Sequence, residues 1–500
     1  MRSFGRFALV LTAVAFISSV SWGSDSVSNR WIVKFRAKST ISKVKFGKPS
    51  QIISYLQSEL AENIEKTGNR DLFRNTSPLW ISNAIAITSN PDEIKRISSM
   101  ENVESVFPVE YRKWISDEPV TKKSIREVQW GVAKVRANEV WQKFSVDGSG
   151  VVVGHLDTGV DGKHPALAGK ILKFKDFISS STEPIDENGH GSHTAGTICG
   201  SEGVGVAPGA RLVSARIFDN FGGGTEEGIL KAMQWVMDPD ENPETNDFPR
   251  LVSNSWGGDT PNKKLFYDAV QSWVALGMLP VFSAGNSGPK GKVGVPGAFP
   301  NTWAIGSTTD KDTLSRFSSI GPSTWEGVTY TKPDVTAPGS EIYSCDMNGK
   351  YSYKSGTSMA CPHVSGLVAM MLQVNPALTI SEIREIVEST VIDIGEKGKD
   401  IKFGSGRIDA FACIEKILPQ TPVENVVQGY KMSLEIESWL NKDSRVSPLA
   451  GPMANYLIER IRLIDDSEFA VLKNLYFNDE AVSEVFKQIN SARKFNSLQH

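Results

Sequence analysis

Cysteine is scarce in this chain of 500 residues, which has only four, at positions 199, 345, 361 and 413. They are too few and too scattered for a disulfide scaffold, and no two have the C-x-x-C spacing of a metal or redox motif. An excess of charge of one sign is also missing, because 54 Lys and Arg stand against 57 Asp and Glu. The net charge of −3 argues against a protein that binds nucleic acid through its charge.

Long apolar runs are missing too, except for one from Phe7 to Val20 that follows two arginines and precedes small residues around Ser21 and Gly23. This order is typical of a secretory signal peptide over residues 1–23. An uncleaved anchor is the alternative, but about fourteen residues fall short of the ~20 that span a bilayer. We therefore expect a protein that is secreted, or periplasmic or otherwise extracytoplasmic, with no membrane span after signal cleavage.

The length predicts more than one domain, and the pattern of strands and helices changes along the chain. Residues 29–113 contain predicted strands at 31–35, 80–88 and 103–109 and predicted helices at 51–66 and 91–97. This β-α-β-α-β order, which leaves room for one further strand, suits a small α+β unit of the split-βαβ kind. Residues 114–127 are polar and aperiodic, which predicts a linker.

Residues 128–418 alternate short apolar strands with helices, which predicts an α/β fold with a doubly wound, mostly parallel sheet and helices on both faces. The predicted strands are 151–156, 212–217, 251–254, 279–283 and 303–306, and the predicted helices are 190–199, 226–237, 263–276 and 358–374. Residues 426–500 look like a helical C-terminal extension without any chemical motif.

Three short segments carry candidate catalytic groups, each at a strand end or a helix start. A buried strand leads into Asp157-Thr-Gly, although a lone buried aspartate is more often structural. His190 and His193 have a spacing that could hold a metal, but no acidic residue completes an H-E-x-x-H set. Ser358 follows a glycine turn at a helix start, in Ser-Gly-Thr-Ser-Met-Ala-Cys-Pro, where the helix dipole is positive.

These three segments make chemical sense together. A serine hydroxyl becomes a good nucleophile when an imidazole removes its proton. The imidazole in turn needs a buried carboxylate to fix its tautomer and stabilise its charged form. The predicted catalytic residues are therefore Asp157, His190 and Ser358, in this order along the chain.

The motifs and their order resemble those of the subtilase family of serine proteases. The resemblance covers about residues 128–415. Trp130-Gly-Val, His164-Pro and Asn254-Ser-Trp-Gly-Gly make the chain most similar to larger secreted members such as the bacillopeptidases. The resemblance implies a subtilisin-like fold and an exported serine endopeptidase, which hydrolyses peptide bonds through an acyl-enzyme and requires no cofactor for its chemistry.

Further site residues are implied by the resemblance. Asn286, in Ser-Ala-Gly-Asn-Ser-Gly, would face the developing oxyanion together with the N–H of Ser358. Two backbone segments would hold the protein or peptide substrate as an added strand, which favours broad specificity. Gly294 would floor the pocket for the residue before the cut; no acidic group is evident there, so we expect a large apolar residue in it. The implied substrate-binding residues are Gly222, Gly223, Gly224, Ser255, Trp256, Gly257 and Gly294.

The resemblance also assigns a role to residues 29–113, as a propeptide that assists folding and then inhibits its own enzyme. Cleavage is expected in the linker, between Tyr111 and Gln129, and the mature enzyme is expected to be a monomer. The loop between Gly200 and Gly205 is too short for the family's usual calcium ligands, although structural calcium could bind elsewhere. Of the cysteines, 199 and 361 suit buried apolar positions, whereas for 345 and 413 a disulfide stays open.

Two other functions stay open at this point. A non-catalytic scaffold on the same fold would usually have lost a catalytic residue, and this chain keeps all of them. A peptide ligase would share the acyl-enzyme, and only product analysis with an added amine would separate ligation from hydrolysis.

Overall fold

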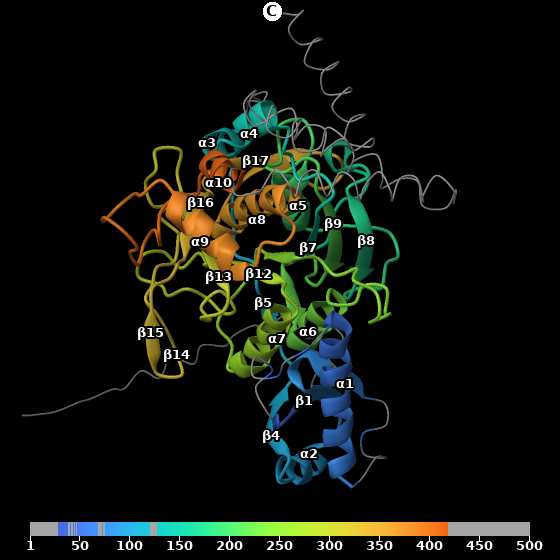
Figure 1. Cartoon of the computed structure of the whole chain (residues 1–500). Coiled ribbons are helices and arrows are strands. Elements are labelled where there is room, and N and C mark those ends of the chain that lie inside the picture. The colour runs from blue at the N-terminus through green and yellow to red at the C-terminus, as the bar shows by residue number, and fades with distance from the viewer. Residues whose placement is uncertain are drawn as a thin grey trace, which may run out of the picture.

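The computed structural model describes residues 29–418, apart from residues 39–40, 42–43, 45, 47, 69–72, 74–75 and 121–127. The predicted signal peptide, residues 1–23, and the predicted helical extension, residues 426–500, lie outside the described residues. Figure 1 shows a larger unit with a smaller unit, coloured blue, against one side of it. Among the described residues, no helix is both long enough and apolar enough to cross a membrane.

The larger unit is built on a seven-stranded parallel sheet with the strand order β16-β13-β12-β11-β7-β9-β8. Neighbouring residues of one strand enter different hydrophobic cores, as Leu251 and Val252 do. Burial on both faces explains the continuous apolar strands and confirms the predicted α/β fold. The strands are β7 (Val152–Asp157), β8 (Ile171–Asp176), β9 (Arg211–Arg216), β11 (Leu251–Asn254), β12 (Leu279–Ser283), β13 (Trp303–Thr308) and β16 (Val335–Pro338).

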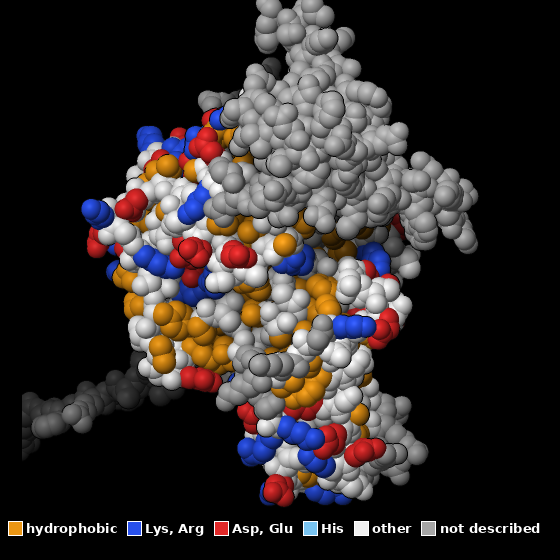
Figure 2. All heavy atoms as spheres, viewed as in Figure 1, with side chains coloured by type: hydrophobic (Ala, Val, Ile, Leu, Met, Phe, Trp, Pro, Cys, Tyr) orange, Lys and Arg blue, Asp and Glu red, His pale blue; other side chains and the backbone are white. Residues whose placement is uncertain are grey.

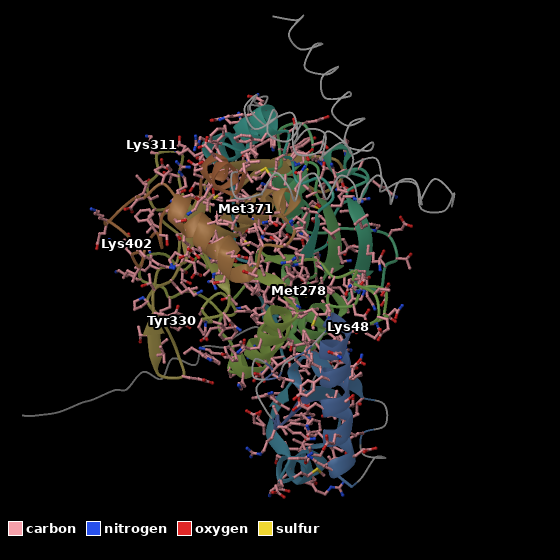
Figure 3. All side chains as sticks on the ribbon, viewed as in Figure 1. Lys48, Met278, Lys311, Tyr330, Met371 and Lys402 are labelled. Carbon is pink, nitrogen blue, oxygen red and sulfur yellow. The ribbon has the colours of Figure 1, made fainter. Side chains whose placement is uncertain are left out.

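Helices cover both faces of this sheet (Figure 1). Helices α6 (Glu226–Trp235) and α7 (Lys263–Ala275) belong to one core, and the others belong to the second. Met278 and Met371 lie inside the larger unit (Figure 3), where both are fully buried. The helices of the second core are α3 (Trp130–Lys134), α4 (Ala137–Phe144), α5 (His190–Cys199), α8 (Thr357–Val374), α9 (Ile380–Thr390) and α10 (Ala410–Ile417).

The smaller unit has a four-stranded antiparallel sheet in the order β2-β3-β1-β4, with two helices. Asn90 caps α2 by accepting a hydrogen bond from the N–H of Glu93. The elements are β1 (Arg30–Phe35), α1 (Pro49–Lys66), β2 (Ser77–Leu79), β3 (Ala84–Thr88), α2 (Pro91–Ser98) and β4 (Val103–Pro108).

The predicted strand over residues 80–88 is wrong in its first half. Residues Trp80–Ser82 form a 3-10 turn, and Asn83 has a left-handed backbone with φ of 48°. Trp80 and Ile81 are nevertheless buried, because this turn packs against α6 and α7. Residues 80–82 are therefore apolar because they are buried against the larger unit, and this apolar pattern resembles that of a strand.

Polar contacts reinforce the docking of the smaller unit on α6 and α7. The Ser82 hydroxyl donates to the carbonyl of Leu265 at 2.8 Å, and the Ser272 hydroxyl donates to the carbonyl of Ile81 at 3.0 Å. Lys34, almost fully buried, pairs with Asp268 at 2.5 Å. Figure 2 shows charged side chains of both signs on the outer face of the smaller unit.

The chain then leaves the smaller unit and runs along the larger one in two short strands. β5 (Tyr111–Lys113) pairs antiparallel with β10 (Gly223–Thr225). β6 (Glu118–Val120) joins β17 (Ile342–Cys345) and β18 (Tyr351–Ser355) in a three-stranded sheet. A separate hairpin contains β14 (Ser323–Trp325) and β15 (Val328–Tyr330).

Candidate active site

The three predicted catalytic residues come from three elements of the larger unit. Asp157 is the last residue of β7, and in parallel sheets the carboxyl ends of the strands carry the working residues. His190 is the first residue of α5. Ser358 is the second residue of α8, which follows Gly356 and packs against α5. All three side chains are buried.

Asp157 and His190 form a buried pair. The Nδ1 atom of His190 lies 2.6 Å from Oδ1 of Asp157. The N–H of Thr158 donates to the same oxygen at 2.7 Å, and the Thr194 hydroxyl donates to Oδ2 at 3.1 Å. Burial by itself would raise the pKa of Asp157, but the charge and hydrogen bond of His190 outweigh burial and lower it. The carboxylate is thus fixed, ionised and aimed at one ring nitrogen.

The other side of the His190 ring faces an aspartate that no sequence motif indicates. Oδ2 of Asp117, in the linker, lies 2.6 Å from Nε2 of His190. The Ser358 hydroxyl donates to Oδ1 of the same carboxylate at 3.0 Å. Burial by itself would lower the pKa of His190, but the charges of Asp157 and Asp117 outweigh burial and raise it to about 10. The imidazole is therefore held in its charged form between two carboxylates.

Asn286 faces the same carboxylate. Its amide nitrogen donates to Oδ1 of Asp117 at 2.8 Å. Its side-chain oxygen accepts from the N–H of Thr357 at 2.9 Å and from the Thr357 hydroxyl at 2.8 Å. These two bonds orient the amide so that its nitrogen faces Oδ1 of Asp117, the same oxygen that the Ser358 hydroxyl contacts.

The predicted substrate-binding glycines hold the linker. Gly223 and Gly224 pair with Lys113 and Arg112 in the β5–β10 ladder. The N–H of Trp114 donates to the carbonyl of Gly222 at 3.0 Å. On the opposite side, the N–H of Gly257 donates to the carbonyl of Trp114 at 3.3 Å. The linker thus lies between the two backbone segments as an added strand.

Ser255 and Trp256 make side-chain contacts at the same place. The Ser255 hydroxyl donates to the carbonyl of Ser358 at 2.8 Å, which holds the start of α8. The ring of Trp256 is buried, and Trp114 packs edge-on against it. The Trp114 indole N–H also donates to the carbonyl of Gly224 at 3.1 Å.

A cavity of about 760 Å³ opens beside Asn286, and Gly294 lines it as predicted. Its wall includes the apolar residues Val295 and Phe299. The expectation of a pocket without acidic residues needs a correction, because Asp259 also lines this cavity. Its carboxylate pairs with Lys263 at 3.1 Å, so its charge is compensated.

His193 does not belong to the group formed by Asp157, His190 and Asp117. Its Nε2 atom donates a hydrogen bond to the carbonyl of Ile342 at 3.0 Å. Burial holds the pKa of His193 well below its usual value. A neutral histidine bonded to a backbone carbonyl explains the second histidine of the motif as a structural residue.

Within the described part of the chain, three acidic side chains could together hold a metal ion. They lie in the loop after α6, with one carboxylate oxygen of each within 4.8 Å of the others: Asp238, Asp240 and Asp247. Asp247 also pairs with Lys173 at 2.7 Å, so one of the three charges already has a cation. The four cysteines are free and buried, which leaves no disulfide among them.

Comparisons with known proteins identify a family and several relatives of this chain. Residues 148–406 match the subtilase family. Bacillopeptidase F of Bacillus subtilis (strain 168) is 30% identical over 430 residues, which cover 76% of this chain and 29% of that protein. Subtilisin NAT of Bacillus subtilis subsp. natto is 28% identical over 420 residues, which cover 82% of this chain and 97% of that protein.

A third relative, M-protease of Shouchella clausii (strain KSM-K16), is 27% identical over 409 residues, covering 81% of this chain and 96% of that protein. The chain thus spans less than a third of bacillopeptidase F but nearly all of the other two proteins. The family match includes the segments that carry Asp157, His190 and Ser358. The chain belongs to the subtilase family of serine endopeptidases.

Proposed function

We propose that the chain is an exported serine endopeptidase, made as a self-processing precursor, in which Asp157, His190 and Ser358 form the catalytic triad. One observation carries this proposal. His190 is paired with the buried Asp157. On its other side, His190, Ser358 and Asn286 all contact one anion, which is the carboxylate of Asp117 in the linker. The position of this anion is where the oxyanion of an acyl-transfer reaction would form.

The triad acts through proton transfers between its own atoms. Once His190 is neutral, its Nε2 takes the hydroxyl proton of Ser358 as Oγ attacks the substrate carbonyl. Asp157 keeps the ring in the correct tautomer and stabilises the imidazolium. The amide of Asn286 and the N–H of Ser358 stabilise the oxyanion. His190 then protonates the leaving amine, and water hydrolyses the acyl-enzyme; these steps involve no cofactor.

The way the linker is held supports a broad specificity. Main-chain bonds from Gly222, Gly223 and Gly257 recognise an extended peptide rather than particular side chains. The cavity beside Gly294 has room and apolar walls for a large residue before the cut. Trp256 and Phe266 surround Trp114, and we assign this apolar site to a substrate side chain further from the cut.

The precursor proposal rests on the smaller unit and the linker. Residues 29–113 would be the propeptide, docked on α6 and α7, and the linker enters the cleft as an added strand. An intramolecular substrate is present at a high effective concentration, so processing should be self-catalysed. Export rests on the signal-peptide pattern of residues 1–23.

The test is the fate of the purified precursor. We expect cleavage between Tyr111 and Gln129, with a first-order rate that does not change with protein concentration, and no cleavage of Ser358→Ala. The matched control is Ser365→Ala, which removes a buried hydroxyl from the same helix and should process normally. A rate that rises with concentration, or trimming of Ser358→Ala at the same bond with no other protease present, would refute the intramolecular scheme.

A further inference from the structure

The linker places a side-chain carboxylate, and not a peptide bond, on the catalytic groups. We propose that Asp117 is an autoinhibitory group, which must leave its position before the precursor can cleave itself at the Ser116–Asp117 bond. This inference rests on the proposed function, because it assigns a regulator and a cleavage site to the same triad.

The contacts of Asp117 engage the groups that the reaction needs. Its Oδ1 accepts hydrogen bonds from the Asn286 amide and the Ser358 hydroxyl, and its Oδ2 lies 2.6 Å from Nε2 of His190. A negatively charged oxygen between these donors imitates the oxyanion of the reaction. While it stays there, the hydroxyl proton of Ser358 points at Asp117, and a substrate carbonyl is excluded from the donors.

The charge on His190 supports the same conclusion. The charged and titratable groups around its ring are Asp157 and His155 from β7, His193 from its own helix, and Asp117 from the linker. With carboxylates on both sides, His190 is protonated and cannot accept the proton of Ser358. Departure of Asp117 removes one of the two anions, lowers the pKa of His190 and allows it to act as a base.

The position of Ser116, rather than the fit of its small side chain to the cavity beside Gly294, points to the bond that is cut. Its carbonyl oxygen lies 3.4 Å from the Asn286 amide nitrogen, whereas Oδ1 of Asp117 is closer, at 2.8 Å. The carboxylate therefore takes the better hydrogen bond. When Asp117 moves away, the carbonyl of Ser116 is the main-chain group that can take its place at the oxyanion donor.

The linker is anchored on both sides of this bond. Lys113 pairs with Gly223 on one side, and Glu118 pairs with Ser355 on the other. The segment can therefore keep its place in the cleft while the residues between the two strands rearrange. A local movement of Asp117, without release of the whole linker, is enough to expose the bond.

The chemical step conserves atoms and protons. Oγ of Ser358 bonds to the carbonyl carbon of Ser116, and the hydroxyl proton passes to His190. The bond from that carbon to the nitrogen of Asp117 breaks, and His190 returns the proton to this nitrogen. Water then hydrolyses the ester between residues 116 and 358, which releases the propeptide as a free acid and restores the hydroxyl.

The test compares purified full-length precursors of the wild type, Asp117→Asn and Asp117→Ala. Loss of a hydrogen-bonded charge should make self-cleavage faster, by about tenfold or more. Glu110→Gln is the control, since it removes a carboxylate that lies between β4 and β5, pairs with Arg112 and is outside the catalytic groups. It should process at the wild-type rate. N-terminal sequencing should find a new N-terminus at position 117 in every case.

The possible outcomes are separable. If neither Asp117 variant is faster while both fold normally by circular dichroism, the autoinhibitory role is wrong. If they are faster but the new N-terminus lies elsewhere, the role stands and the assigned bond is wrong. The double variant Asp117→Asn with Ser358→Ala distinguishes failure of the proposed function, because its cleavage with no other protease present would remove Ser358 from the reaction altogether.

Discussion

Trp114 of the linker and Trp256 of the larger unit pack edge to face, with ring centroids 6.0 Å apart and both side chains buried. Phe266 contacts both rings, with centroid distances of 5.6 and 6.3 Å. Buried aromatic residues at the centre of an interface usually carry most of its binding energy. This cluster should therefore hold the linker and the propeptide on the enzyme after cleavage.

We predict that Trp114→Ala weakens inhibition by the cleaved propeptide by about tenfold or more. The inhibition constant is measured by dilution of the freshly processed mixture, with hydrolysis of a peptide substrate as the readout. Lys95→Ala is the control, because Lys95 is exposed on α2 of the smaller unit and should change inhibition little. Equal effects of the two substitutions would contradict a central role of the aromatic cluster.

The second prediction concerns the partner of His190. Asp157→Asn keeps the shape of the side chain but no longer holds the imidazole in the correct tautomer, so kcat should fall by about 10⁴-fold. The measurement is hydrolysis of a peptide by enzyme from which the propeptide has been removed. Asp310→Asn, at an exposed position, should leave kcat unchanged. A fall below about tenfold in Asp157→Asn would exclude Asp157 as the orienting carboxylate.

The third prediction concerns the oxyanion donor. Asn286→Ala should lower kcat by about 10²–10³ with little change in KM, a size that was measured for the loss of this donor in subtilisin. Thr357→Val removes one of the two hydrogen bonds that orient the amide and should lower kcat less. A change confined to KM would mean that Asn286 binds the substrate and does not face the oxyanion.

The fourth prediction concerns pH. The pKa of His190 is raised from 6.5 to about 10 in the precursor, so its charge stabilises the folded state fully below pH 6.5. This contribution is lost as the pH rises from 6.5 toward 10. In the non-processing background Ser358→Ala, the free energy of unfolding in urea should fall over this range. Adding Asp117→Asn should make the fall smaller, and an identical fall would contradict the ion pair.

The sequence was sufficient to propose Asp157, His190 and Ser358 as catalytic candidates and to predict five of the seven strands of the parallel sheet, all but β8 and β16, for a physical reason. Asp157 and Ser358 lie at a strand end and a helix start, and such positions are marked locally by apolar runs and glycine turns. Parallel strands buried on both faces begin with apolar runs, and the predicted bounds of β11 and β12 coincide with those in the structure. The fold class and the candidate catalytic residues can thus be predicted from patterns that span only a few residues of the sequence.

Asp117 could not be predicted in this way. It lies in a polar segment without periodicity, and its contacts are with residues 190, 286 and 358, which only tertiary structure brings near. The same holds for the 3-10 turn at Trp80–Ser82, whose burial depends on another unit. One hint was present, because Trp114 and Ile115 are two adjacent apolar residues in a largely polar linker.

We propose that Ser358 is the nucleophile of a site that Asp117 closes in the precursor. The most direct measurement is labelling with a fluorophosphonate, followed by mass spectrometry of the digested protein. We expect one adduct on Ser358 in the processed enzyme, much slower labelling of the intact precursor, and none in Ser358→Ala. An adduct on another residue, or labelling retained in Ser358→Ala, would contradict the account.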